Sequence, residues 1–145
     1  MAAVTAVAAP VARVSAATPI PEACGSPDFG TWAEAVSDQG VSIGISCART
    51  RKGRFVVLAP PAGSSAFVEA VAISRASRIV GLAGTSPSLP AVWATPTAVP
   101  QTLPLPPGTD DDTAEGIDDL GDVLVDAFTL QTRVSSTWIL AGRLI

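Results

Sequence analysis

The chain has 145 residues, 48% of them hydrophobic and 15% charged, with no histidine and a formal net charge of −4. A chain of this length forms one domain with a sizeable core, and its apolar runs stay short of the roughly 20 residues that a membrane-spanning helix needs, so we expect no membrane partner. Without histidine, Ser-His-Asp and Cys-His catalytic sites and His-ligated metals are excluded, so we predict that the protein is not an enzyme and binds no cofactor.

Residues 1–30 are predicted to form an extended N-terminal arm, and residues 31–145 a single β-sandwich domain. Four prolines interrupt helical structure in the arm: Pro10, Pro19, Pro21 and Pro27. The Ala-rich start lacks the basic beginning and the continuous apolar stretch of a secretory signal, although a degenerate export signal stays the alternative. Between residues 29 and 36 we expect a short turn or helix, with Asp28 placed as its cap.

The clearest β-hairpin is predicted between residues 41 and 58. Val41, Ile43 and Ile45 alternate along its first strand, and residues 55–58 form its second. The intervening sequence RTRKGR contains Gly53, which supplies the positive φ that a tight turn needs.

The centre of the chain is predicted to contribute short strands joined by proline-rich connections. Residues 66–73 fit either a helical or a β spacing, and the β-like segment 78–83 that follows favours a strand. Another short strand is expected at residues 91–95. Residues 95–108 contain five of the thirteen prolines, which predicts an extended connection able to pair only at a sheet edge.

The last part of the chain is predicted to hold an acidic loop or one helical turn at residues 110–121, followed by two strands within residues 122–145. In the first strand Val123 and Val125 share one face, and in the second Trp138 alternates with its polar and aliphatic neighbours. Together these segments give seven or eight short strands, a pattern typical of an all-β antiparallel sandwich.

The apolar content exceeds what one small core requires. The mean hydropathy is +0.42, which is high for a chain without a membrane span. We therefore expect part of the apolar surface to be buried against other copies or partners, and a homo-oligomer rather than a monomer. The three tryptophans are the expected anchors of the core or of such interfaces: Trp32, Trp93 and Trp138.

A small basic group is a candidate nucleic-acid contact. Four of its members lie within six positions and two lie further along the chain: Arg49, Arg51, Lys52, Arg54, Arg75 and Arg78. Such side chains can contact phosphates, but no aromatic residue is interleaved with them to stack on bases. Salt bridges with the acidic stretch of an adjacent copy are an equally good interpretation.

The acidic stretch is a candidate calcium site. Calcium takes six to eight oxygen ligands, and four neighbouring carboxylates could supply several of them: Asp110, Asp111, Asp112 and Glu115. Their spacing does not match the calcium-binding D-x-D-x-D-G loop, so a solvated acidic loop is the simpler interpretation. A neighbouring copy could complete the ligand shell at a subunit interface.

The two cysteines leave two alternatives open. Cys24 and Cys47 are 23 residues apart and belong to no metal-binding pattern. They form either one disulfide bond, as in exported proteins, or two buried thiols.

The stretch ISRASRIVGLAGTSPSLPAVWATPTAVP resembles the central strands of single jelly-roll coat proteins from small icosahedral plant viruses, such as tymovirus-like coats. In that family a strand with an Ala-Ser pair leads through a Pro/Thr-rich turn to a V-x-W-like strand, matched here by Ala76-Ser77 and Val92-Trp93. The ending VLVDAFTLQ followed by SSTWILAGRL is similar too. The chain departs from the family in being short and in lacking a basic arm.

The resemblance implies a jelly-roll capsid subunit that self-assembles into an icosahedral virion shell without catalytic residues. Its implied partners are other copies of itself, other virion proteins and packaged nucleic acid. One alternative is a minor virion protein with a cement, decoration or tail-associated role. Another is a small exported, extracellular bacterial β-sandwich that binds a partner.

Overall fold

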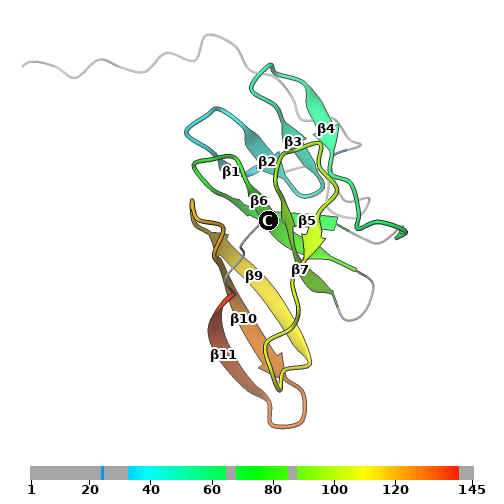
Figure 1. Ribbon diagram of the computed structural model, residues 1–145, viewed down its shortest axis with the longest axis vertical. Helices are drawn as coiled ribbons and strands as arrows, with labels where there is room; N and C mark the ends of the chain where they lie inside the picture. The colour runs from blue at the N-terminus through cyan, green and yellow to red at the C-terminus, as the bar shows by residue number, and fades with distance from the viewer. Residues whose placement is uncertain (1–23, 25–32, 65–67, 85–87, 141–145) are drawn as a thin grey trace, which may run out of the picture.

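The computed structural model describes Cys24 and residues 33–64, 68–84 and 88–140. Within these ranges it contains eleven β-strands and no α-helix, and hence no helix that could span a membrane. All strand pairs are antiparallel and form three sheets (Figure 1). The all-β sandwich is confirmed. Jelly-roll topology is not confirmed, because each sheet joins strands that are consecutive in the chain. Apart from Cys24, the predicted arm at residues 1–30 lies outside the described residues.

The first sheet has four short strands: β1 (Ala33–Val36), β2 (Ser42–Gly44), β3 (Cys47–Arg49) and β4 (Phe55–Val57). The turn or helix predicted up to residue 36 is wrong where the structure describes it, because β1 pairs with β2. The predicted hairpin pairing also needs correction. The chain bends after β2, so β4 pairs with the intervening β3. The predicted turn is confirmed, with Gly53 at a φ of 82°.

The second sheet contains β5 (Val68–Ile73), β6 (Ile79–Ala83), β7 (Leu89–Trp93) and β8 (Gln101–Thr102). The ambiguous segment at residues 66–73 is thus a strand from Val68 onward, as predicted. The proline-rich connection pairs with β7 at the sheet edge, through the two residues of β8 and the amide of Leu103, which donates to the backbone oxygen of Pro90 at 2.7 Å. This is the behaviour expected of a segment whose prolines cannot donate ladder hydrogen bonds.

The third sheet contains β9 (Asp111–Ile117), β10 (Val123–Thr129) and β11 (Val134–Leu140). The prediction of a loop or helical turn in the acidic stretch is wrong. The stretch forms β9, because pairing with β10 places Ala114 opposite Val125 on the buried face. Both strands predicted within residues 122–145 are present, and the second begins at Val134. Residues 141–145 lie outside the described part.

The second sheet lies between the other two and is covered on both faces (Figure 1). Side chains of β6 alternate between two cores: Ile79 and Ala83 pack with the first sheet, whereas Val80 packs with Val123 of the third. Because successive residues of a strand point to opposite faces, a strand buried on both sides reads as a continuous apolar run. This explains the sequence IVGLA of β6.

Gly81 of β6 has no room for a side chain. It lies opposite Ala70, where β5 contains a bulge between Ala70 and Ala72. A Cβ added to Gly81 would overlap the backbone carbonyl of Glu69. Backbone atoms in a covered sheet cannot move aside as a flexible side chain would, so only glycine fits at this position.

We predict that Gly81→Ala lowers the free energy of unfolding by about 3 kcal/mol or more, because the added methyl group forces the β5 backbone away. Urea denaturation measures the loss. Gly116→Ala is the matched control, since no heavy atom lies within 4 Å of the added Cβ in β9. The change in its free energy of unfolding should stay within about 1 kcal/mol. Equal losses in the two variants would contradict this account of the packing.

Candidate functional site

The exposed cations of the β3–β4 turn form the first candidate surface. Backbone hydrogen bonds between Thr50 and Arg54 and from Gly53 to Thr50, each 2.8 Å long, shape this turn. It presents Arg51, Lys52 and Arg54 to solvent around an open hollow of about 410 Å³. Within the described part of the chain these three side chains form no ion pair. They are therefore available to an anionic partner.

Arg49 belongs to the same turn but is held differently. It is half-buried, and its Nε atom is buried without a hydrogen-bond partner. Its guanidinium lies against the turn, with Nη2 only 3.2 Å from the position of a Cβ added to Gly53. Arg49 therefore packs beneath the turn, and its guanidinium is less accessible than those of Arg51 and Arg54.

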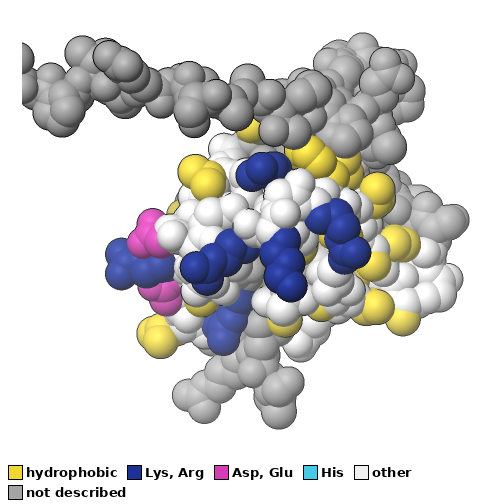
Figure 2. Space-filling view, turned by 90° about the horizontal axis from the view of Figure 1, so that it is seen from above, with side chains coloured by type: hydrophobic (Ala, Val, Ile, Leu, Met, Phe, Trp, Pro, Cys, Tyr) yellow, Lys and Arg dark blue, Asp and Glu magenta, His cyan; other side chains and the backbone are white. Residues whose placement is uncertain are grey.

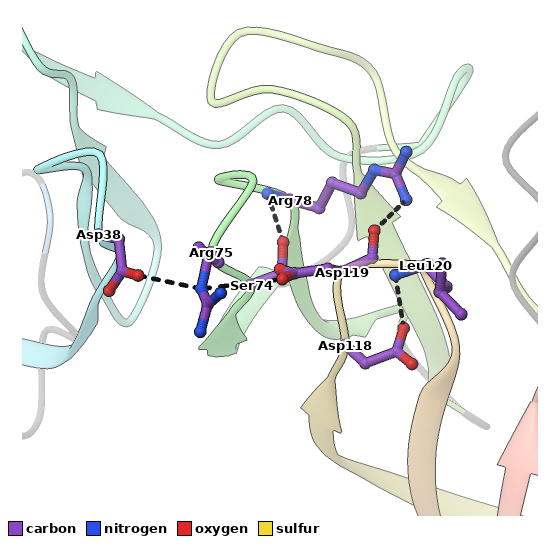
Figure 3. Close-up of polar contacts among 7 residues, drawn as sticks. All are labelled: Asp38, Ser74, Arg75, Arg78, Asp118, Asp119 and Leu120. Carbon is purple, nitrogen blue, oxygen red and sulfur yellow. Dashed lines mark hydrogen bonds and ion pairs between the residues drawn. The ribbon is translucent and has the colours of Figure 1, made fainter.

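Arg75 and Arg78 are already engaged by acidic and carbonyl groups of this chain (Figure 3). The Nε atom of Arg75 lies 3.0 Å from Oδ2 of Asp38 and 3.8 Å from Oδ2 of Asp119. Arg78 donates through Nη1 to the backbone oxygen of Asp119, at 3.3 Å. Unlike Arg51, Lys52 and Arg54, these two cations therefore have partners within the described part of the chain. The six predicted basic residues do not form one patch of unpaired cations.

Three hairpin turns meet at Arg75, one from each sheet. Ser37 of the β1–β2 turn and Ser77 of the β5–β6 turn are buried and hydrogen-bonded through their hydroxyls, at 2.9 Å. Ser77 has a positive φ of 64°. Across the junction, Oδ1 of Asp118 accepts hydrogen bonds from three backbone amides of the β9–β10 turn. The sequence alone does not predict this junction, because the residues that form it are far apart in the chain.

Positive charge dominates the face seen from above the first sheet. In Figure 2, Lys and Arg side chains are spread across this face, whereas Asp and Glu side chains gather at one edge. The chain as a whole carries a net charge of −4. The distribution of charge, rather than its sum, thus gives the protein a basic face.

The strand conformation separates the carboxylates that were predicted to bind calcium. Asp110 accepts a hydrogen bond from the amide of Leu130 at 2.8 Å, and Asp111 accepts one from the amide of Asp112 at 2.9 Å. Glu115 and Asp111 are exposed, whereas Asp112 is buried on the opposite face of β9. No group of three or more possible metal ligands forms among the described residues. The alternation of the strand therefore places Asp112 on the opposite face from Asp111 and Glu115.

Asp112 is an unusual buried acid. Its side chain is 3% exposed and neither carboxylate oxygen has a hydrogen-bond partner. It lies opposite Ala127, on the same face of the third sheet as Ala114. Burial, and secondarily the charge of Asp111, raises the pKa of Asp112 from 3.8 to about 6. No local pattern predicts the burial of Asp112, because it lies within a run of otherwise exposed acids.

The predicted tryptophan anchors have different roles. Trp93 is fully buried in the first core, and its Nε1 donates to the backbone oxygen of Ala59 at 2.8 Å. Trp138 of β11 is 38% exposed, with Nε1 donating to Ser136 at 2.7 Å. Trp93 is therefore a core residue, and Trp138 stays available for an interface. Trp32 lies outside the described residues.

The third sheet carries most of the exposed apolar surface. Six of the nine large apolar side chains exposed in the described ranges lie in its strands or turns: Leu120, Leu124, Leu130, Val134, Trp138 and Ile139. Leu124 and Ile139 are paired across β10 and β11 and line an open groove of about 320 Å³. The sequence predicted surplus apolar surface, and the structure locates it here.

The cysteines form a disulfide bond. Cys24 and Cys47 are both buried, and their sulfur atoms are bonded. Of the two alternatives that the sequence left open, the structure has the bonded one. The bond also ties one residue of the predicted N-terminal arm to β3 of the sandwich.

Comparison with known proteins gives no relative from which a function could be transferred. No protein-family model matches the chain, and neither a curated protein nor a solved structure matches it. The resemblance to tymovirus-like coat proteins therefore stays a prediction that rests on the sequence motifs. The surfaces described above carry the functional argument.

We predict that Asp112 makes stability fall as pH rises from about 4 to 6. The folded protein binds the proton of Asp112 more tightly than the unfolded chain does. The free-energy cost of burying the ionised carboxylate is therefore absent below pH 3.8 and fully present above pH 6. Asp112→Asn should remove this slope and add up to about 3 kcal/mol of unfolding free energy at pH 7.

Urea denaturation of both proteins at pH 4, 5 and 7 measures the difference. Glu115→Gln, an exposed change on the same strand, is the control and should leave the slope in place. A slope that persists in Asp112→Asn would show that another group causes it.

Proposed function

We propose that the protein is a non-enzymatic structural subunit that associates with copies of itself. The observation that carries this proposal is the concentration of exposed apolar side chains on the third sheet, with Leu120, Leu130 and Ile139 each at least 68% exposed. Large exposed apolar patches on a folded domain mark sites of association. The sequence supports a non-catalytic role, because it contains no histidine to act as a general base or nucleophile activator.

The finer proposal is a shell subunit of a virion, as the sequence resemblance implies. Copies would bury the third sheet in their contacts and leave the basic face above the first sheet free. Contact with a packaged nucleic acid would then rest on Arg51, Lys52 and Arg54, because Arg75 and Arg78 are engaged within the chain. Three cations provide weak contact per subunit, which many copies in one shell would multiply.

A second candidate is a small exported β-domain that binds a partner outside the cell. The bond between Cys24 and Cys47 favours it, because disulfide bonds persist mainly in oxidising compartments. In this case the exposed side of the third sheet would meet a different protein rather than another copy.

Sedimentation velocity and negative-stain microscopy of the purified chain test self-association. We expect assemblies larger than a monomer, and we expect Ile139→Lys to reduce their size by placing charge on the apolar surface. Val99→Lys is the matched control, since Val99 is also exposed, at 60%, but lies outside the third sheet. A chain that stays monomeric at all concentrations and salt conditions, with its disulfide bond intact by mass spectrometry, would favour the second candidate.

Binding of single-stranded RNA as a function of salt tests the role of the basic turn. We expect the triple variant Arg51→Gln, Lys52→Gln and Arg54→Gln to bind more weakly and to lose about 2 from the slope of log affinity against log salt. The control is the double variant Arg75→Gln and Arg78→Gln, which should change the slope less. Equal binding by the triple variant and the unsubstituted protein would rule out this contact.

A further inference from the structure

The edges of the three sheets differ in how well they are protected against pairing. In the described structure the edge strands are β1, β4, β5, β8, β9 and β11. Natural proteins guard edges with short strands, bulges, prolines or charges. Here β1 and β5 contain bulges, β4 and β8 have only three and two residues, and β9 carries acidic side chains.

Only β11 has none of these protections among the described edges. Its seven residues, Val134–Leu140, have the sequence VSSTWIL, with no charge and no proline. They pair with β10 in an unbroken register. On the other side of β11 no described strand is present, so alternate backbone N–H and C=O groups point outward. A long, regular and uncharged edge of this kind is a template for another strand.

We propose that β11 pairs antiparallel with β11 of a second copy, joining two three-stranded sheets into one sheet of six strands about a two-fold axis. This inference rests on the proposed self-association and identifies the contact that carries it. The register that pairs all seven residues places Thr137 opposite itself on the axis. A two-fold axis makes the contact isologous, so one surface serves both copies.

The side chains of β11 suit this pairing. In the register centred on Thr137, Val134 lies opposite Leu140 and Ser135 lies opposite Ile139, so each exposed aliphatic side chain gains a cross-strand neighbour. Trp138, which is partly exposed in the single chain, lies opposite Ser136 of the other copy. No like charges meet between residues 134 and 140, whereas the acidic β9 would repel a second β9.

Cysteine cross-linking tests the register directly. Residues directly opposite in an antiparallel pair have Cα atoms about 4.5 to 5.5 Å apart, which is within the range of a disulfide bond. The chain's own cysteines are bonded to each other, so an introduced thiol is the only free one. We expect Thr137→Cys to form a covalent dimer on mild oxidation with copper phenanthroline, seen on a non-reducing gel.

Two controls separate this register from random collision. Thr113→Cys places an exposed thiol on β9, the other edge of the same sheet, and should stay monomeric on the gel. Ser135→Cys and Ile139→Cys should each fail to cross-link alone, because identical positions would lie about 13 Å apart. The same two variants should cross-link when mixed, and this result does not depend on Thr137, whose hydroxyl donates to Asp126.

The outcomes distinguish the inference from the proposed function. Assemblies of the unsubstituted protein together with cross-linking of Thr137→Cys would support both. Assemblies without cross-linking of either Thr137→Cys or the mixed pair would overturn pairing through β11 and leave self-association in place. A monomeric protein in which Thr137→Cys cross-links no faster than Thr113→Cys would overturn both.

Discussion

The fold depends on the burial of both faces of the β5–β8 sheet. Antiparallel sheets commonly leave one face in water, but here β6 sends alternate side chains into two separate cores. The first and third sheets pack against the middle sheet through these cores. Because Gly81 has no side chain, the backbone of β5 can lie against it at Glu69, next to the bulge in β5. Changes in β6 are therefore felt by all three layers.

The three-layer arrangement also explains where the surface becomes apolar. The third sheet covers the middle one with the face that holds Val123 and Val125, and its other face is left to solvent. In its last strand, Trp138 and Ile139 are both exposed and lie on opposite faces of β11. Apolar side chains that neither core buries are thus concentrated on the third sheet, where a second copy can cover them.

Local patterns predicted most of the strands, because period-two alternation survives wherever one face of a strand is buried. They failed at β9, where acidic residues favour a loop and pairing with β10 overrides that preference. The same failure hid Asp112, which a loop would have left in water. Local patterns also could not show that Arg75 is engaged within the chain, because Asp38 and Asp119 reach it only where three distant turns meet.

The sequence by itself determined the all-β class, the turn at Gly53, the edge position of the proline-rich segment and the surplus of apolar surface. Each follows from backbone preference or composition, which act over a few residues. The tertiary structure alone decided the three layers, the bond between Cys24 and Cys47, the burial of Asp112 and the exposure of β11. These features depend on which distant segments share a sheet, and that choice is set by the joint burial of both faces of the middle sheet rather than by any local pattern.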